Sequence, residues 1–136
     1  MTDFASQLEW NEIAESLDQH GYAVVDLLSP AECAQLIESY DEQALFRKQV
    51  VMEKHGYGRG AYRYYAYPLP PLIAMLRTSL YDELAKIANR WNEALKIEMR
   101  FPETHASFLK RCHDAGQEKP TPLLLRYAPE DFNCLH

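Results

Sequence analysis

The sequence predicts one α+β domain, and three patterns carry that prediction. Apolar residues recur at helical spacing in several segments, of which 76–95 is the longest. β-prone runs rich in valine and tyrosine flank a glycine-rich turn at 56–60, and a further β-prone run follows at 123–127. The chain has 136 residues, fewer than the roughly 150 of a typical domain, so we expect a single domain over residues 1–136.

The chain opens with a predicted helix and a predicted strand. Apolar residues from Trp10 to Leu17 share one helical face, and Gly21 stands where a C-terminal cap is expected. The run 22–28 is β-prone and ends at Ser29.

Ser29 and Glu32 form the sequence pattern of a capping box, with Pro30 at the first helical position. This pattern predicts a second helix that begins here and ends near Phe46. Its buried stripe would consist of Cys33, Leu36, Ile37, Tyr40 and Ala44.

The rest of the chain predicts a hairpin, two helices and a strand. Residues 49–52 and 62–67 are expected to pair around the glycine-rich turn. The segment 76–95 predicts a long helix, with an interruption at Thr78 and Ser79 left open, and a shorter helix around Phe108 should close at Gly116. The face of the long helix would carry Leu76, Leu80, Leu84, Ile87, Trp91 and Leu95.

Charge and cysteine usage limit the classes of partner and compartment. The formal net charge of −6 argues against nucleic acid as a partner, because such a partner is held mainly by phosphate neutralisation. Three widely spaced cysteines fit reduced thiols better than disulfides, which favours the cytoplasm. Neither a leader pattern nor a long apolar stretch is present, so secretion and membrane spanning are not expected.

Two motifs in the middle of the chain invite a ligand-binding interpretation. Residues 56–61 match the G-x-G-x-x-G/A dinucleotide pattern, but a strand-like run follows instead of a helix, which favours a flexible hairpin turn. Aromatic and cationic residues alternate just beyond, and Arg59, Tyr62 and Tyr64 are candidates to contact a substrate by stacking. In the alternative, Tyr62 and Tyr64 cover the core, and Tyr65 and Tyr67 meet solvent.

Cysteine and histidine residues also suggest a zinc site, but their spacing argues against it. Cys112 and His113 are neighbours on a predicted helix and therefore point about 100° apart. Zinc held by these two residues together with Cys134 and His136 is not expected.

The most informative stretch is 123–136, which is typical of a strand, a tight turn and a new strand that ends in His136. Mononuclear iron oxygenases hold iron with two histidines and one carboxylate. On a strand, residues i and i+2 point to the same side, so a His-x-Asp pair can reach one ion. His136 would be the histidine of such a pair, and its carboxylate partner would be residue 138, beyond this sequence.

The sequence resembles the Fe(II)- and 2-oxoglutarate-dependent oxygenases, specifically a bacterial group with prolyl-hydroxylase-like jelly-roll domains. The resemblance covers essentially the whole chain and the front portion of the family's domain. It is carried by the segments Gly56-Tyr57-Gly58, Tyr67-Pro68-Leu69-Pro70, Ala88-Asn89-Arg90-Trp91, Cys112-His113-Asp114-Ala115-Gly116-Gln117, Pro120-Thr121-Pro122-Leu123-Leu124-Leu125 and Asn133-Cys134-Leu135-His136.

The resemblance implies a fold, cofactors and site residues. The fold would be N-terminal helices packed on the opening strands of a double-stranded β-helix, incomplete in this chain. Fe(II) would be bound by His136, and Tyr127, in a turn similar to that of the nucleic-acid dealkylases, would contact 2-oxoglutarate. The family's aspartate, distal histidine and basic residue have no counterparts here. Leu125 and Glu130 depart from the dealkylase pattern, so that substrate class is not carried over.

Two main hypotheses follow. In the first, the chain is the N-terminal portion of a dioxygenase that hydroxylates a small-molecule or protein substrate, and it is inactive as this fragment. In the second, it is a non-catalytic interaction or structural module derived from that fold. A third, a base-binding module that uses the tyrosine hairpin, predicts single-strand affinity that falls with salt. Missing late strands would leave unpaired edges, so a homodimer or aggregate is expected.

Overall fold

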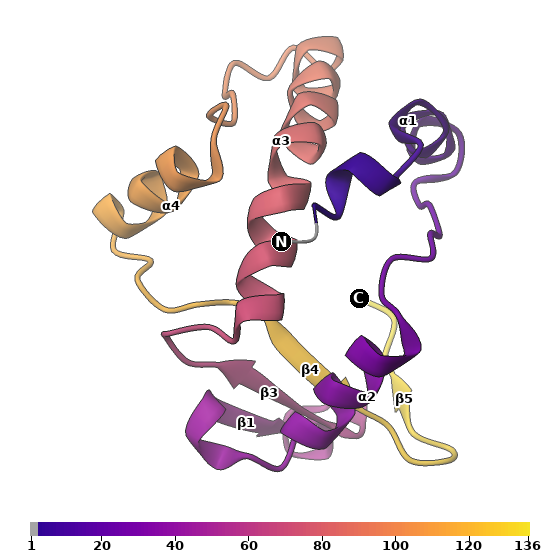
Figure 1. Ribbon diagram of the computed structural model, residues 1–136, viewed down its shortest axis with the longest axis vertical. Coiled ribbons are helices and arrows are strands. Elements are labelled where there is room, and N and C mark those ends of the chain that lie inside the picture. Colours follow the sequence, from indigo (N-terminus) through magenta and orange to yellow (C-terminus); the bar gives the residue numbers. More distant parts are fainter. Residues whose placement is uncertain (1–2) are drawn as a thin grey trace. The chain divides into compact units, whose positions relative to one another are not determined.

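Four α-helices and five β-strands make up residues 3–136, the part of the chain described by the computed structural model (Figure 1). The chain divides into two compact units, a helical unit and a sheet unit. The helical unit consists of the described residues up to Leu28 together with Pro71–Glu118, and the sheet unit of Ser29–Pro70 and Lys119–His136. The mixed α and β class is confirmed, whereas the single domain and the jelly roll stay predictions.

The helical unit contains α1 (Trp10–His20), α3 (Pro71–Ala94), α4 (His105–Asp114) and the 3-10 helix Ala5–Gln7. Gly21 caps α1 in the left-handed conformation that the sequence predicted. Helix α3 continues through position 78 without interruption, and the Thr78 hydroxyl donates to the Ala74 carbonyl, one turn earlier, at 3.0 Å.

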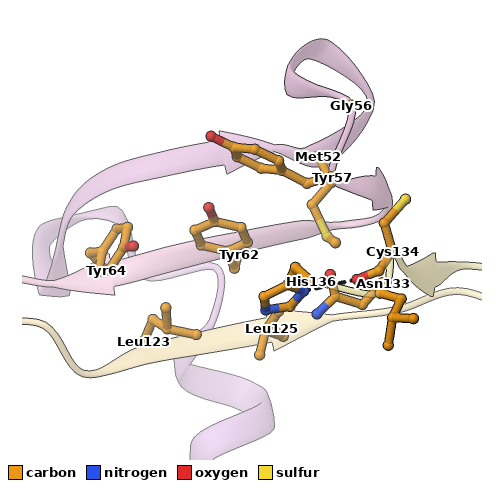
Figure 2. Close-up of a pocket in the computed structure, with 11 residues that line it drawn as sticks. Met52, Gly56, Tyr57, Tyr62, Tyr64, Leu123, Leu125, Asn133, Cys134 and His136 are labelled. Atoms are coloured by element: carbon orange, nitrogen blue, oxygen red, sulfur yellow. Dashed lines mark hydrogen bonds between the residues drawn. The ribbon is translucent and has the colours of Figure 1, made fainter.

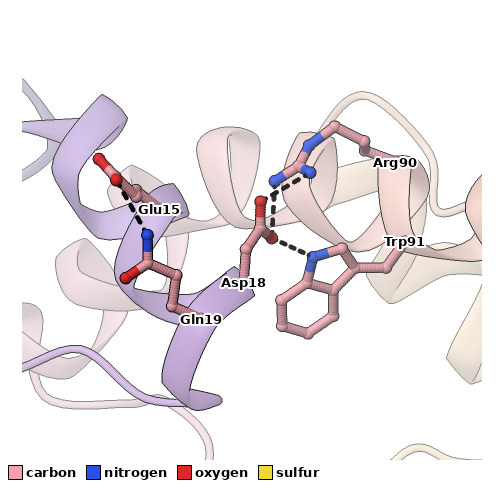
Figure 3. A network of polar contacts seen from close by, with 5 residues as sticks. All are labelled: Glu15, Asp18, Gln19, Arg90 and Trp91. Carbon is pink, nitrogen blue, oxygen red and sulfur yellow. Dashed lines mark hydrogen bonds and ion pairs between the residues drawn. The ribbon is translucent and has the colours of Figure 1, made fainter.

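Helix α1 is tied to α3 by one carboxylate. Asp18 accepts two hydrogen bonds from the Arg90 guanidinium, each 3.0 Å, and a third from the Trp91 indole at 2.7 Å (Figure 3). The hydrogen bonds from Arg90 and then Trp91 lower the pKa of the Asp18 carboxyl. The two residues of the Arg90-Trp91 pair therefore have a structural partner within the helical unit.

The predicted strand at 22–28 does not form. The segment contains no residue in a strand, and Val24 is 88% exposed. An extended run becomes a strand only when another strand pairs with it, and no strand among residues 3–136 does so. β-propensity alone was misleading here.

The sheet unit contains α2 (Pro30–Ser39) and two antiparallel sheets. The larger sheet has the order β1 (Phe46–Val51), β3 (Ala61–Tyr65) and β4 (Leu123–Arg126). The smaller sheet pairs β2 (Gly58–Arg59) with β5 (Phe132–Asn133). Short 3-10 helices span Gln43–Leu45 and Met52–His55. The predicted hairpin is confirmed by the pairing of β1 with β3. Along the chain β2 lies between these two strands, but it belongs to the smaller sheet.

Helix α2 begins at the predicted capping box, in which the Ser29 hydroxyl accepts from the Glu32 amide. It ends at Ser39, not near Phe46, because Phe46 pairs with Tyr65 as the first residue of β1. The predicted buried stripe is largely wrong, since Cys33 is exposed and Ile37 is 74% exposed, whereas Tyr40, just after the helix, is buried.

One face of the larger sheet is covered by the sheet unit's own side chains, and we call it the closed face. Tyr65 is fully buried there and stacks on Phe46, with 4.7 Å between the ring centroids. The Arg63 guanidinium lies over the Tyr40 ring at 4.9 Å, and Arg126 lies over the same ring at 4.2 Å. The interpretation that Tyr65 meets solvent is therefore wrong.

Two further observations concern the described residues as a whole. None of the helices within residues 3–136 combines the length and the apolar character needed to cross a membrane. Cys33, Cys112 and Cys134 are all free thiols.

Candidate functional site

The opposite face of the larger sheet carries a pocket of about 470 Å³, and we call it the open face. Figure 2 shows side chains from β3, β4, the segment around Tyr57 and the C-terminal residues around this pocket. Its walls include Met52, Tyr57, Tyr62, Tyr64, Leu125 and His136.

Strand alternation and register place the tyrosines and leucines of the pocket. Tyr62 and Tyr64 are two residues apart on β3 and so point to one side of the sheet. Directly across on β4, Tyr62 faces Leu125 and Tyr64 faces Leu123. The two tyrosine rings meet edge to face at 5.6 Å. The result is an aromatic and aliphatic floor.

The pocket lining contains no Asp, Glu, Lys or Arg. Burial raises the pKa of the Tyr62 phenol, and the neighbouring Tyr64 and Tyr57 raise it further. The phenol therefore stays neutral and able to donate a hydrogen bond at neutral pH. The Arg47 guanidinium lies over the Tyr64 ring at 4.6 Å and donates to the Pro120 carbonyl at 3.0 and 2.8 Å.

His136 reaches the pocket because the strand before it is attached to β2. The Cys134 amide donates to the Tyr57 carbonyl at 2.8 Å, next to the β2–β5 pairing. The His136 Nδ1 lies 2.8 Å from the Cys134 carbonyl oxygen, which can only accept (Figure 2). Nδ1 therefore donates this hydrogen bond, so Nε2 is the ring nitrogen left to take a ligand.

The donor set suits His136 as one metal ligand and does not by itself complete a site. A non-haem Fe(II) centre of the facial type requires a second histidine and a carboxylate. Across residues 3–136, no three His, Cys, Asp or Glu side chains gather as such a centre would need. Of the three ligands that such an Fe(II) centre requires, the pocket supplies one, the His136 imidazole.

Tyr127 directly follows β4, and its ring packs against Gly60. A Cβ atom built at Gly60 would lie 3.0 Å from Cδ1 of the Tyr127 ring. By alternation Tyr127 belongs to the same face as Leu125, although it is not one of the residues that line the pocket. Its predicted contact with 2-oxoglutarate stays a prediction.

Arg59 has a partner outside the pocket. Its Nε lies 3.1 Å from the Asp131 carboxylate, and its backbone pairs with Phe132. The Asp131 carboxylate also accepts the Ala128 amide at 2.7 Å. The substrate role of Arg59 stays a prediction, whereas Tyr62 and Tyr64 do line the pocket.

Sequence reasoning missed Met52 and Cys134 among the residues that line the pocket. A signal existed for Cys134, because residues two apart on a strand share a side and His136 was already chosen. Tyr57 belongs to the tyrosine hairpin, and it lines the pocket as well. Met52 was assigned to a strand, and instead it starts a 3-10 helix and is buried.

Comparison with known proteins points to one family. Residues 60–136, more than half of the chain, match the Oxygenase-NA family, described as "Oxygenase, catalysing oxidative methylation of damaged DNA". The match contains β3, β4, Tyr127 and His136.

Two uncharacterized proteins of Mycobacterium tuberculosis, from the strains CDC 1551 / Oshkosh and ATCC 25618 / H37Rv, are also similar. Each is 35% identical over 99 residues, which cover 69% of this chain and 42% of the relative. The chain thus spans well under half the length of these curated relatives. No solved structure matches the chain.

Proposed function

This chain belongs to the Oxygenase-NA family, and from that membership we propose that it is the N-terminal portion of an Fe(II)- and 2-oxoglutarate-dependent dioxygenase. The observation that carries the proposal is the pocket on the open face, which the His136 imidazole lines together with a floor of tyrosines and leucines. In this proposal the sheet unit supplies the opening strands of a prolyl-hydroxylase-like jelly roll.

His136 would hold the metal through Nε2. When bound, Fe(II) and 2-oxoglutarate together supply the activation of dioxygen for hydroxylation. The Cys134 carbonyl fixes the ring through Nδ1, at 2.8 Å, so that its tautomer suits a cation. The second histidine and the carboxylate would come from further chain of a protein as long as the relatives, which this chain covers only to 42%.

Tyr127 would donate its hydroxyl hydrogen to the cosubstrate. Its ring lies against Gly60, on the face of the sheet that carries Leu125. Tyr62 and Tyr64 would form the wall against which a substrate packs, and their apolar rings would exclude water from the reacting centre.

We propose a small-molecule or protein substrate, since the net charge of −6 opposes a polyanion. A second candidate is a base of damaged DNA, which the family description names and which the tyrosines at the pocket could stack. Fluorescence anisotropy with methylated single-stranded DNA at low and high salt separates the two. Absence of binding at low salt would support the first candidate, and binding that falls steeply with salt would support the second.

The decisive measurement for activity is iron-dependent succinate formation from 2-oxoglutarate. We expect none from the 136-residue chain, because one imidazole cannot hold Fe(II) at useful affinity. We expect turnover from a polypeptide that continues to the length of the relatives. If that longer polypeptide bound neither Fe(II) nor 2-oxoglutarate, the alternative of a non-catalytic interaction or structural module would be favoured.

We also propose that the isolated chain self-associates and belongs to a reducing compartment such as the cytoplasm. Strands β1 and β4 are the outer strands of the larger sheet, and their outward backbone groups can pair with a second copy. Light scattering should show a homodimer or larger species, and a monodisperse monomer would contradict this. Three free thiols are consistent with the compartment.

A further inference from the structure

Gly58 lies where the backbones of β2 and β5 approach most closely. Its φ of +126° favours glycine, and a Cβ atom there would lie 2.2 Å from the Phe132 carbonyl oxygen. The same Cβ would lie 3.0 Å from the Cys134 nitrogen and 3.1 Å from the Asn133 Cα. All three neighbours are backbone atoms, so no side-chain rotation can relieve the overlap.

Gly60, two residues on, leaves room for a ring. Its φ is +140°, and a Cβ there would lie 3.0 and 3.2 Å from two carbons of the Tyr127 ring and 3.3 Å from the Arg126 carbonyl oxygen. Gly56 offers a contrast within the same segment. It also has a positive φ, +69°, yet nothing lies within 4 Å of the Cβ position.

We propose that Gly58 and Gly60 are positioning residues, which seat the strand that ends in His136 and the ring of Tyr127 respectively. The roles of His136 and Tyr127 rest on the proposed function, but the seating itself does not. The glycine-rich segment 56–60 is thus more than a turn between β1 and β3, because it is the platform on which both candidate site residues are placed.

Because β5 is so short, its position depends on the platform formed by residues 56–60. The strand has two residues, and the backbone links identified between it and the platform are the pairing with Gly58 and Arg59 and the Cys134–Tyr57 bond of 2.8 Å. Short elements with few bonds open locally at little cost. A side chain at position 58 would therefore release β5 without unfolding the larger sheet.

Amide hydrogen exchange of the 136-residue chain tests the seating of β5. We expect the Cys134 amide to be protected in the wild type and to exchange about tenfold faster or more in Gly58→Ala, since the added Cβ would overlap the Phe132 carbonyl oxygen and the neighbouring backbone of β5. The Tyr65 amide, bonded to the Pro122 carbonyl at 3.0 Å, should keep its protection.

The control is Gly56→Ala, which also puts a side chain at a positive φ next to the same Tyr57 acceptor but has no neighbour within 4 Å of the new Cβ atom. It should leave the Cys134 amide unchanged relative to Tyr65. Equal acceleration in both variants would overturn the proposal. So would a wild-type Cys134 amide that exchanges as fast as an unstructured chain end, an outcome that can be read even if Gly58→Ala fails to fold.

A second pair of measurements separates this proposal from the proposed function. In a polypeptide as long as the relatives, Gly60→Ala should weaken 2-oxoglutarate binding and leave Co(II) affinity and Cys134 protection intact. Gly58→Ala should weaken Co(II) binding. If Gly58→Ala released β5 yet left Co(II) affinity unchanged, the seating would be upheld and the metal role of His136 overturned. If Gly60→Ala left the Tyr127 ring contacts unchanged by nuclear Overhauser effects, the Gly60 half would be overturned.

Discussion

The two faces of the larger sheet use the same strands for opposite purposes. On the closed face, Tyr65 is fully buried against Phe46, and two arginines lie over the Tyr40 ring. On the open face, Tyr62 and Tyr64 are only partly buried, and they border a pocket of about 470 Å³. Side chains of the sheet unit fill the closed face, whereas the open face keeps a pocket that can take a ligand.

The difference between the two faces distinguishes the residues of β3 that stabilise the fold from those that can bind a ligand. Tyr64 and Tyr65 are neighbours in sequence and identical in chemistry, yet alternation sends them to opposite sides of the sheet. A closed-face residue should therefore matter mainly for stability, and an open-face residue mainly for binding.

The largest expected effect is on stability, from Tyr65→Ala. Removing a fully buried aromatic ring should lower the free energy of unfolding by about 3–5 kcal/mol, because it leaves a cavity that the stacked Phe46 cannot fill. Tyr62→Ala should cost about 1 kcal/mol, since its ring already borders open space. Urea unfolding of both variants measures the contrast, and similar losses would show that the open face is core as well.

The second effect is on metal binding by a polypeptide as long as the relatives. His136→Ala should lower Co(II) affinity by about 100-fold or more, because losing even an outer-shell partner of a metal ligand typically costs about 10–100-fold. Stability should not change, since His136 is exposed. His20→Ala, an exposed histidine at the end of α1, is the control. Isothermal titration would reveal an unaffected affinity, which would remove His136 from the site.

The third effect is on the cosubstrate. Tyr127→Phe should weaken 2-oxoglutarate binding by about tenfold, because one hydrogen bond to a charged group contributes about 1.5–3 kcal/mol. Tyr22→Phe removes another exposed hydroxyl and should change nothing. An equal affinity for wild type and Tyr127→Phe would mean that the ring against Gly60 is only packing.

Local signals in the sequence predicted much of the fold. The Ser29–Glu32 capping box and the glycine after α1 fix helix ends by nearest-neighbour chemistry, so they could be predicted without tertiary information. The end of α2 and the fate of 22–28 could not, because both depend on whether a distant strand is present to pair. Phe46 pairs with Tyr65 of β3, whereas no strand within residues 3–136 pairs with Val24.

The site was predictable in part for the same reason. Alternation placed Tyr62 and Tyr64 on one side, but it could not say which side the rest of the chain would cover. His136 was selected because the stretch that ends in it resembles an iron oxygenase motif, whereas its attachment through Gly58 depends on a backbone approach of distant segments. Arg59 was a substrate candidate because cations and aromatics interleave in its segment, and its ion pair with Asp131 could not be predicted because that partner is far along the sequence.

The smallest effect is on the pH dependence of stability, and it again compares the two faces. Burial raises the pKa of both Tyr65 and Tyr62 above the ordinary value of 10.0, so the folded chain holds each proton more tightly than the unfolded chain does. This contribution to stability is complete below the ordinary pKa and is lost as pH rises through the folded pKa.

Urea midpoints from about pH 8 to about pH 11 should therefore fall less steeply in Tyr65→Phe than in wild type. Tyr62→Phe should flatten the profile less, because Tyr62 borders the open pocket and Tyr65 is fully buried. The reverse order would mean that the open face excludes water better than the closed one.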